Sequence, residues 1–151
     1  MPRIAREANV VWEGTISRGA GVVEATSSGA FALPVTIASR VGDPEGKTSP
    51  EELLAAAHAT CYVTSLGGEL ARARTPPERL VVHCTIIMDE VQGIGHRIVA
   101  SGIVARGIVP GCNAAGFAQA AETADQGCSF SALIRASATV TIDASLEQGE
   151  S

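Results

Sequence analysis

The sequence has few aromatic residues and no strongly basic stretch. Aromatics make up 3% of the 151 residues, and 16 acidic residues face 11 basic ones, giving a net charge of -5. Nucleic-acid-binding proteins carry clustered basic residues, often with aromatics among them, so we expect no nucleic-acid partner. No stretch approaches the roughly 18 apolar residues of a membrane span, and residues 1–12 lack the apolar core of a secretion signal. We therefore expect a cytoplasmic protein with no membrane partner.

The four cysteines lack the spacing of the common metal and redox motifs. They are Cys61, Cys84, Cys112 and Cys128. Without a Cys-x-x-Cys pair, a zinc ribbon or a thioredoxin motif is not supported, and a cytosolic chain is not expected to hold a structural disulfide framework. His58 and His83 lie near two of these cysteines, but at no standard metal-ligand spacing. We therefore expect no metal.

Small and apolar residues are abundant instead. Hydrophobic residues make up 46% of the chain, and glycine occurs 16 times. The length suits one domain spanning residues 1–151. Small side chains each bury little apolar area, so we expect the chain to gain stability by association into an oligomer.

The order of apolar patterns predicts an α+β fold, βββ-α-ββ-α-β. The predicted strands are Ile4–Trp12, Val22–Thr26, Phe31–Ala38, Leu80–Asp89, His96–Val109 and Arg135–Asp143. The predicted helices are Pro50–Ala73 and Asn113–Asp125, with a short helical turn from Cys128 to Leu133. Glycine and proline residues between these segments mark the expected turns.

The predicted helix that begins at Pro50 organises the chain. Ser49 can cap it, Pro50 suits its first position, and Glu52 completes a capping box with Ser49. From Leu53 to Leu66 the residues are apolar or small on nearly every side. Such a helix is expected to be buried on most sides.

Two of the thiols have contrasting local settings. Cys61 lies about three turns into the helix, where the dipole gives a thiolate little help and apolar surroundings raise the pKa. A reactive Cys61 would need a cation supplied by the fold; otherwise it is a packed core residue. Cys128 opens a helical turn, whose free amide groups can lower a thiol pKa. Whether these two thiols meet cannot be decided from the residues alone.

Two segments resemble the cysteine motifs of the OsmC/Ohr family of thiol peroxidases. The segment Thr48–Cys61, TSPEELLAAAHATC, resembles the first motif, and Gly127–Leu133, GCSFSAL, is similar to the second. Residues 12–19 and 109–111 resemble the OsmC branch. The chain departs from the family at Ser129 and Phe130, where proline and valine are usual.

The resemblance implies a cysteine-based, peroxiredoxin-type reductase of hydroperoxides that serves in oxidative and osmotic stress. Organic hydroperoxides would be preferred and hydrogen peroxide reduced more weakly. Cys61 would be the peroxidatic thiol and Cys128 the resolving thiol that forms an intramolecular disulfide with it. Arg40 would supply the cation, and Glu51 would hold it. An external dithiol would return the electrons, and no cofactor would be needed.

The resemblance also implies an intertwined homodimer, with strands wrapped around two central helices. Glu51 and Cys61 are ten residues apart on the predicted helix, which corresponds to about 15 Å along its axis. We therefore expect the Arg40–Glu51 pair to approach Cys61 of the partner subunit.

Two other interpretations stay open. One is a redox-inactive dimer of this fold that binds an apolar ligand. The other is a zinc site formed by Cys61, Cys128 and histidines. For His58 and Cys84 we expect packing roles in the core, His58 with hydrogen bonds to its ring.

Overall fold

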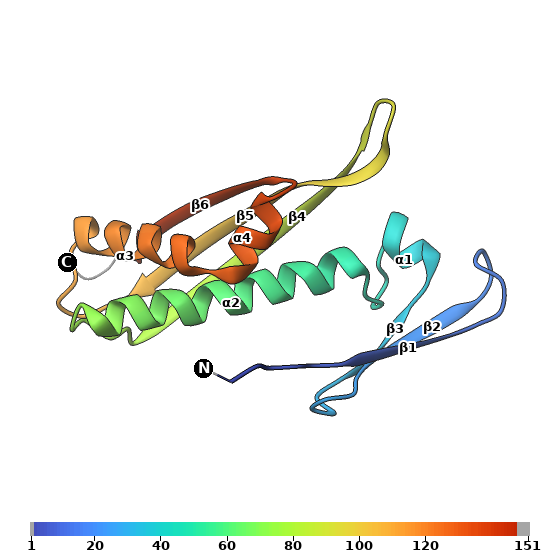
Figure 1. Cartoon of the computed structure of the whole chain (residues 1–151), viewed down its shortest axis with the longest axis horizontal. Helices are drawn as coiled ribbons and strands as arrows, with labels where there is room; N and C mark the ends of the chain where they lie inside the picture. Colours follow the sequence, from blue (N-terminus) through green and yellow to red (C-terminus); the bar gives the residue numbers. More distant parts are fainter. Residues whose placement is uncertain (1, 148–151) are drawn as a thin grey trace. The chain divides into compact units, whose positions relative to one another are not determined.

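The computed structural model describes residues 2–147. Their contacts form two compact units, which divide between Leu53 and Leu54. In chain order the elements run β1-β2-β3-α1-α2-β4-β5-α3-α4-β6 (Figure 1). This order confirms the predicted α+β class and adds one short helix, α1, that was not expected.

The first unit holds an antiparallel sheet with β2 in the middle. Its strands are β1 (Ala8–Glu13), β2 (Ala20–Ala25) and β3 (Ala32–Val35). Pro34 lies in the edge strand β3, where a residue without an N–H is tolerated.

The prediction of a strand over Phe31–Ala38 was wrong in its second half. Residues Ile37–Val41 form α1 instead. Thr36 accepts a hydrogen bond from the Ser39 amide, and the Ser39 hydroxyl accepts one from the Thr36 amide. This reciprocal capping box stabilises a helix start that the apolar pattern of the segment did not reveal.

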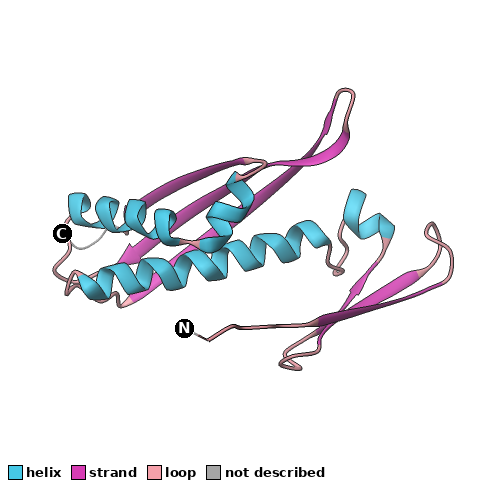
Figure 2. Ribbon diagram, viewed as in Figure 1, coloured by secondary structure: helices cyan, strands magenta, loops and turns pink. Residues whose placement is uncertain are grey.

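The second unit holds a sheet with the strand order β4-β5-β6. Strands β4 (Arg79–Val91) and β5 (Gly95–Ile108) form an antiparallel hairpin, and β6 (Thr139–Leu146) pairs parallel to β5. Three helices accompany this sheet: α2 (Pro50–Arg72), most of which lies in this unit, α3 (Ala114–Gly127) and α4 (Ser129–Arg135). Figure 2 shows α2 and α3 running along the sheet.

The core of the second unit lies between its helices and its sheet. Its fully buried apolar residues include Tyr62, Leu66 and Leu70 of α2, Phe117 of α3 and Ile103 of β5. The Tyr62 hydroxyl donates to the Ala121 carbonyl at 2.9 Å, which satisfies its polar end within the core.

Two features of this unit, the start of α3 and the inward face of β4, follow local sequence signals closely. Helix α3 begins after Asn113, whose side chain accepts a hydrogen bond from the Gly116 amide, as the predicted cap requires. In β4, Leu80, Val82 and Cys84 share the more buried face, as the alternation predicts.

The closing strand was predicted too early in the chain. Arg135 ends α4, and β6 begins only at Thr139. The alternation from Thr139 onward was read correctly, but the helical turn continues past Leu133: the Ala136 amide donates to the Ala132 carbonyl, and the Ser137 and Ala138 amides donate to the Ile134 carbonyl.

Helix α2 is buried along one stripe rather than on most sides. Its buried residues are His58, Tyr62, Leu66 and Leu70, which recur every four residues. A single chain therefore covers one face of a helix whose sequence is apolar on several faces.

Candidate active site

The fold brings the thiols of Cys61 and Cys128 together. Cys61 projects from the middle of α2, and Cys128 stands at the junction of α3 and α4. Their sulfur atoms lie 3.3 Å apart, with Cys128 donating to Cys61. Cys128 is 1% exposed, whereas Cys61 is half-buried. A disulfide between the two thiols would need only a short movement, because an S–S bond is about 2.05 Å long.

Backbone geometry at Cys128 holds this thiol in place. Cys128 ends α3 by donating its amide to the Asp125 carbonyl, and it caps α4 by accepting the Ser131 amide on its sulfur at 3.4 Å. One residue thus serves two helices, with an extended backbone (φ -84°, ψ 114°) between them.

The surroundings of Cys61 favour its thiolate. Burial raises the pKa of Cys61, but hydrogen bonds from the Phe130 backbone, the Cys128 thiol and the Ser129 hydroxyl and backbone outweigh it, so that the pKa lies below its usual value. The Ser129 hydroxyl is 3.8 Å from the Cys61 sulfur. These donors come from the start of α4, so the thiolate is favoured without a cation from within this unit.

The surroundings of Cys128, in contrast, favour its protonated thiol. Burial raises its pKa above the usual value, although the amide and hydroxyl of Ser131 act against this. The helix-start amides of Ser131 and Phe130 thus lower the pKa of Cys128, as we expected of such a position, but burial outweighs them. Cys128 is therefore held as the thiol.

Arg40 and Glu51 form an ion pair in the first unit. The Arg40 Nη2 atom lies 2.9 Å from Glu51 Oε2, and Arg40 Nε lies 3.2 Å from the same oxygen. The Arg40 side chain is 42% exposed and that of Glu51 is 14% exposed. Such paired hydrogen bonds fix the orientation of a guanidinium. This pair and the cysteine pair lie in different units.

His58 is a buried histidine with a partner at each ring nitrogen. Its Nδ1 atom lies 2.6 Å from the Ser101 hydroxyl and its Nε2 atom 2.9 Å from the Ser131 hydroxyl. The expectation of a hydrogen-bonded core histidine is confirmed. Sequence reasoning missed Ser101 and Ser131, because a lone serine in a strand or helix has no pattern that marks it.

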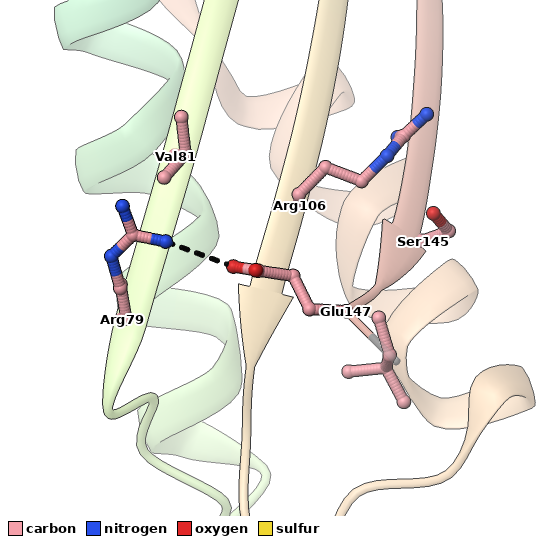
Figure 3. A pocket seen from close by; sticks show the side chains of 6 residues that line it. Arg79, Val81, Arg106, Ser145 and Glu147 are labelled. Carbon is pink, nitrogen blue, oxygen red and sulfur yellow. Dashed lines mark hydrogen bonds and ion pairs between the residues drawn. The ribbon is translucent and has the colours of Figure 1, made fainter. Parts of the chain in front are cut away.

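A hollow on the second sheet is lined by Arg79, Val81, Arg106, Ser145, Leu146 and Glu147. The Arg79 guanidinium binds the Glu147 carboxylate across it at 3.1 Å (Figure 3). Arg79 and Val81 alternate with Leu80 and Val82, which pack against the core. The hollow therefore opens on the face away from the helices that carry both cysteines, and we assign it no part in their chemistry.

Residues 2–147 contain neither a metal-ligand cluster nor a membrane-spanning helix. No three residues among their histidines, cysteines and carboxylates are grouped as a metal ion would require. Within the same range, no helix has the length and apolar character needed to cross a membrane.

Comparison with known proteins places the chain in a family. Residues 42–143 match the family described as OsmC-like protein. The chain is 31% identical over 137 residues to Peroxiredoxin OsmC of Escherichia coli (strain K12), covering 91% of this chain and 94% of that protein. It matches Peroxiredoxin OsmC of Shigella flexneri to the same extent.

Solved structures agree at the level of the fold. An organic hydroperoxide resistance protein OsmC from Legionella pneumophila has a TM-score of 0.73 at 19% identity, covering 95% of this chain and 99% of that one. The organic hydroperoxide resistance protein OhrB of Bacillus subtilis has a TM-score of 0.71 at 16% identity, covering 91% and 97%. With the family match and the identity to the curated relatives, these findings show that the chain belongs to the OsmC family.

Proposed function

We propose that this protein is a cysteine-based peroxidase that reduces organic hydroperoxides, with Cys61 as the peroxidatic thiol and Cys128 as the resolving thiol. The observation that carries the proposal is the 3.3 Å separation of the two sulfur atoms. The lowered pKa of Cys61 and the raised pKa of Cys128 support the same assignment of peroxidatic and resolving roles, because the thiolate is the nucleophile.

The proposed chemistry balances in three steps. The Cys61 thiolate attacks the terminal oxygen of the hydroperoxide, the O–O bond breaks, and the alkoxide takes up a proton to leave as an alcohol. The Cys128 sulfur then attacks the Cys61 sulfenic acid, forming the disulfide while the hydroxyl leaves as water. An external dithiol reduces the disulfide by exchange and is itself oxidised.

Two observations support an organic substrate. Peroxiredoxin OsmC is the name of the curated relatives, and solved relatives are described as organic hydroperoxide resistance proteins. The Phe130 backbone contacts the Cys61 sulfur, and its partly buried side chain packs against the core. A bulky apolar residue beside the thiolate suits an alkyl peroxide better than hydrogen peroxide. We place the reaction in the cytoplasm.

We further propose that residues 1–151 work as one OsmC-like domain within a homodimer. Val10, Val11 and Val22 of the first sheet are 48–57% exposed, and α2 buries only one stripe of residues. A second chain could cover such surfaces. In this dimer the Arg40–Glu51 pair of one chain would face Cys61 of the partner subunit and stabilise negative charge on the leaving oxygen.

The direct test is mass spectrometry of the reduced protein after one equivalent of cumene hydroperoxide. We expect a loss of two hydrogens and a peptide that joins Cys61 to Cys128. A Cys61→Ser variant should lose turnover by a factor of about 10³ or more, since the nucleophile is removed.

A Cys128→Ser variant separates the two roles. It should still consume one equivalent of peroxide but accumulate the Cys61 sulfenic acid, which dimedone traps with a fixed mass increase. Unchanged steady turnover in this variant would remove Cys128 from the reaction. An unmodified wild-type protein after peroxide would favour the redox-inactive dimer that binds an apolar ligand.

A further inference from the structure

A continuous chain of polar side chains runs through the core to the resolving thiol. It starts at Cys84 in β4, whose sulfur lies 3.2 Å from the Ser101 hydroxyl of β5. Ser101 contacts the His58 ring at 2.6 Å, and His58 contacts the Ser131 hydroxyl at 2.9 Å. The Ser131 amide donates to the Cys128 sulfur at 3.4 Å, and a hydrogen bond from the Ser131 side chain acts to lower the pKa of Cys128. His58, Ser101 and Ser131 are each 0% exposed, so water does not compete for these bonds.

The directions of these hydrogen bonds determine one another. The single proton of Cys128 is directed to the Cys61 sulfur, so the Cys128 sulfur accepts the Ser131 hydroxyl proton. The Ser131 oxygen, having donated, accepts the proton on His58 Nε2. A neutral histidine then has a bare Nδ1 atom, which accepts from Ser101. Each side chain along this path donates once, and every donor points toward Cys128.

We propose that His58 is a positioning residue that acts through Ser131 to ready Cys128 for its attack on oxidised Cys61. The inference rests on the proposed function, and it concerns the second chemical step alone. His58 directs the Ser131 hydroxyl toward Cys128, and that hydroxyl stabilises the charge that develops on the sulfur as its proton leaves.

The step balances without a further reactant. When Cys61 is a sulfenic acid, the Cys128 sulfur forms the S–S bond and the S–O bond of Cys61 breaks. The Cys128 proton, already directed at Cys61, leaves with the hydroxyl as water. His58 neither gains nor loses a proton overall. Its part is to hold the hydroxyl of Ser131 as a donor, because a hydroxyl free to rotate could accept the Cys128 proton instead and favour the thiol.

The charged groups around His58 are consistent with a neutral ring. Burial lowers its pKa below the usual value, Asp125 raises it and Arg135 lowers it. Asp125 and Arg135 are themselves paired at 2.9 Å. The Cys84 thiol lies 3.8 Å from His58 Nδ1, and burial raises the pKa of Cys84. We therefore expect both His58 and Cys84 to be neutral at neutral pH.

The test measures the two chemical steps separately in rapid-quench experiments with cumene hydroperoxide. Dimedone trapping reports Cys61 oxidation, and mass analysis reports the Cys61–Cys128 disulfide. The Ser131→Ala variant removes the hydroxyl but keeps the amide donor. We expect disulfide formation to slow about tenfold or more, as for loss of one hydrogen bond to a charged group, while Cys61 oxidation changes less than about threefold. The control is Ser137→Ala, the same change at an exposed serine just after α4. The rates of both steps in this variant should equal those of the wild type.

A second pair of variants tests His58 itself. Glutamine carries an N–H donor and a carbonyl acceptor, whereas leucine fills similar space with neither. We expect His58→Leu to slow disulfide formation and His58→Gln to restore part of the rate, with thermal melting used to compare their folding. The pH profile of disulfide formation should move to higher pH in Ser131→Ala, because a lost donor raises the pKa of a thiol.

The outcomes distinguish the proposals. Wild-type protein whose Cys61 is not oxidised by peroxide would overturn the proposed function. Oxidation of Cys61 with disulfide formation unaffected in Ser131→Ala, or slowed equally with the first step, would overturn the role of His58 and Ser131 alone. Equal rates and pH profiles in His58→Leu and His58→Gln would reduce His58 to a packing residue.

Discussion

At the scale of single residues, the pKa difference between the two thiols depends on which donors reach each sulfur. Cys61 receives hydrogen bonds from Ser129 and Phe130 and from the Cys128 thiol. Cys128 is almost fully buried, and that burial dominates its pKa. The two sulfur atoms lie 3.3 Å apart, yet their pKa values are shifted in opposite directions.

This difference predicts the order of alkylation. A thiol with a lowered pKa is ionised at lower pH, so its reaction with iodoacetamide begins at lower pH and fades only as pH falls below that pKa. We expect Cys61 to be modified at lower pH than Cys128, as followed by peptide mass spectrometry. Ser129→Ala removes one hydrogen-bond donor to Cys61 and should move the pH dependence of Cys61 alkylation to higher pH. Earlier modification of Cys128 would contradict this assignment.

At the scale of elements, a glycine in β5 sets how closely the sheet and α3 approach. A Cβ atom at Gly107 would lie 2.9 Å from the Leu80 side chain and 3.1 Å from the Phe117 ring. Phe117 is 1% exposed and lies in the centre of the core. The absence of a side chain at Gly107 therefore allows the α3 aromatic ring to pack directly on the strand.

We expect Gly107→Ala to destabilise the protein by about 1–3 kcal/mol, because the added methyl overpacks the core. Gly102→Ala is the matched control in the same strand, since its Cβ would meet only Thr141 Oγ1 at 3.4 Å. It should be neutral or slightly stabilising. The stability of both variants is measured from their urea unfolding midpoints. All samples have the same protein concentration, because association alters apparent stability. A Gly107→Ala protein as stable as Gly102→Ala would contradict this packing.

At the scale of the whole molecule, the exposed apolar surfaces and the Arg40–Glu51 pair are parts of one proposal. The guanidinium is oriented by paired hydrogen bonds yet keeps 42% of its side-chain surface exposed. In the proposed homodimer this exposed part would face the partner's Cys61. The proposal thus assigns residues of each active site to two chains.

A mixed dimer tests this assignment. Arg40→Ala and Cys61→Ser chains with different tags are expressed together, and the heterodimer is isolated. If Arg40 serves the partner's Cys61, the heterodimer keeps one complete site and should show about half the wild-type turnover, while the Cys61→Ser homodimer is inactive and the Arg40→Ala homodimer is reduced at least tenfold.

If Arg40 serves its own chain, the heterodimer has no complete site. Its activity would then fall to half that of the Arg40→Ala homodimer or less. A sedimentation measurement at micromolar concentration checks the assembly itself. A monomer under these conditions would contradict the homodimer.

The sequence by itself determined most of the local structure. The capping pattern near Pro50 and the Asn113 cap located the starts of α2 and α3, and alternation identified the inward face of β4. One error occurred where a side chain caps a helix without a distinctive pattern, at Thr36 before α1, and another where α4 continues to Arg135, beyond its predicted end at Leu133. Such signals act between residues only a few positions apart, so a single chain segment contains nearly all of the information.

Only the tertiary structure decided which groups surround the thiols. Cys61 and Cys128 are 67 positions apart, and His58 and Ser131 are 73 apart. The amides that favour the Cys61 thiolate belong to α4, not to its own helix, so the local reading assigned the lower pKa to the wrong cysteine. A thiol pKa depends on burial and on donors within hydrogen-bond distance, and both depend on how distant segments pack together.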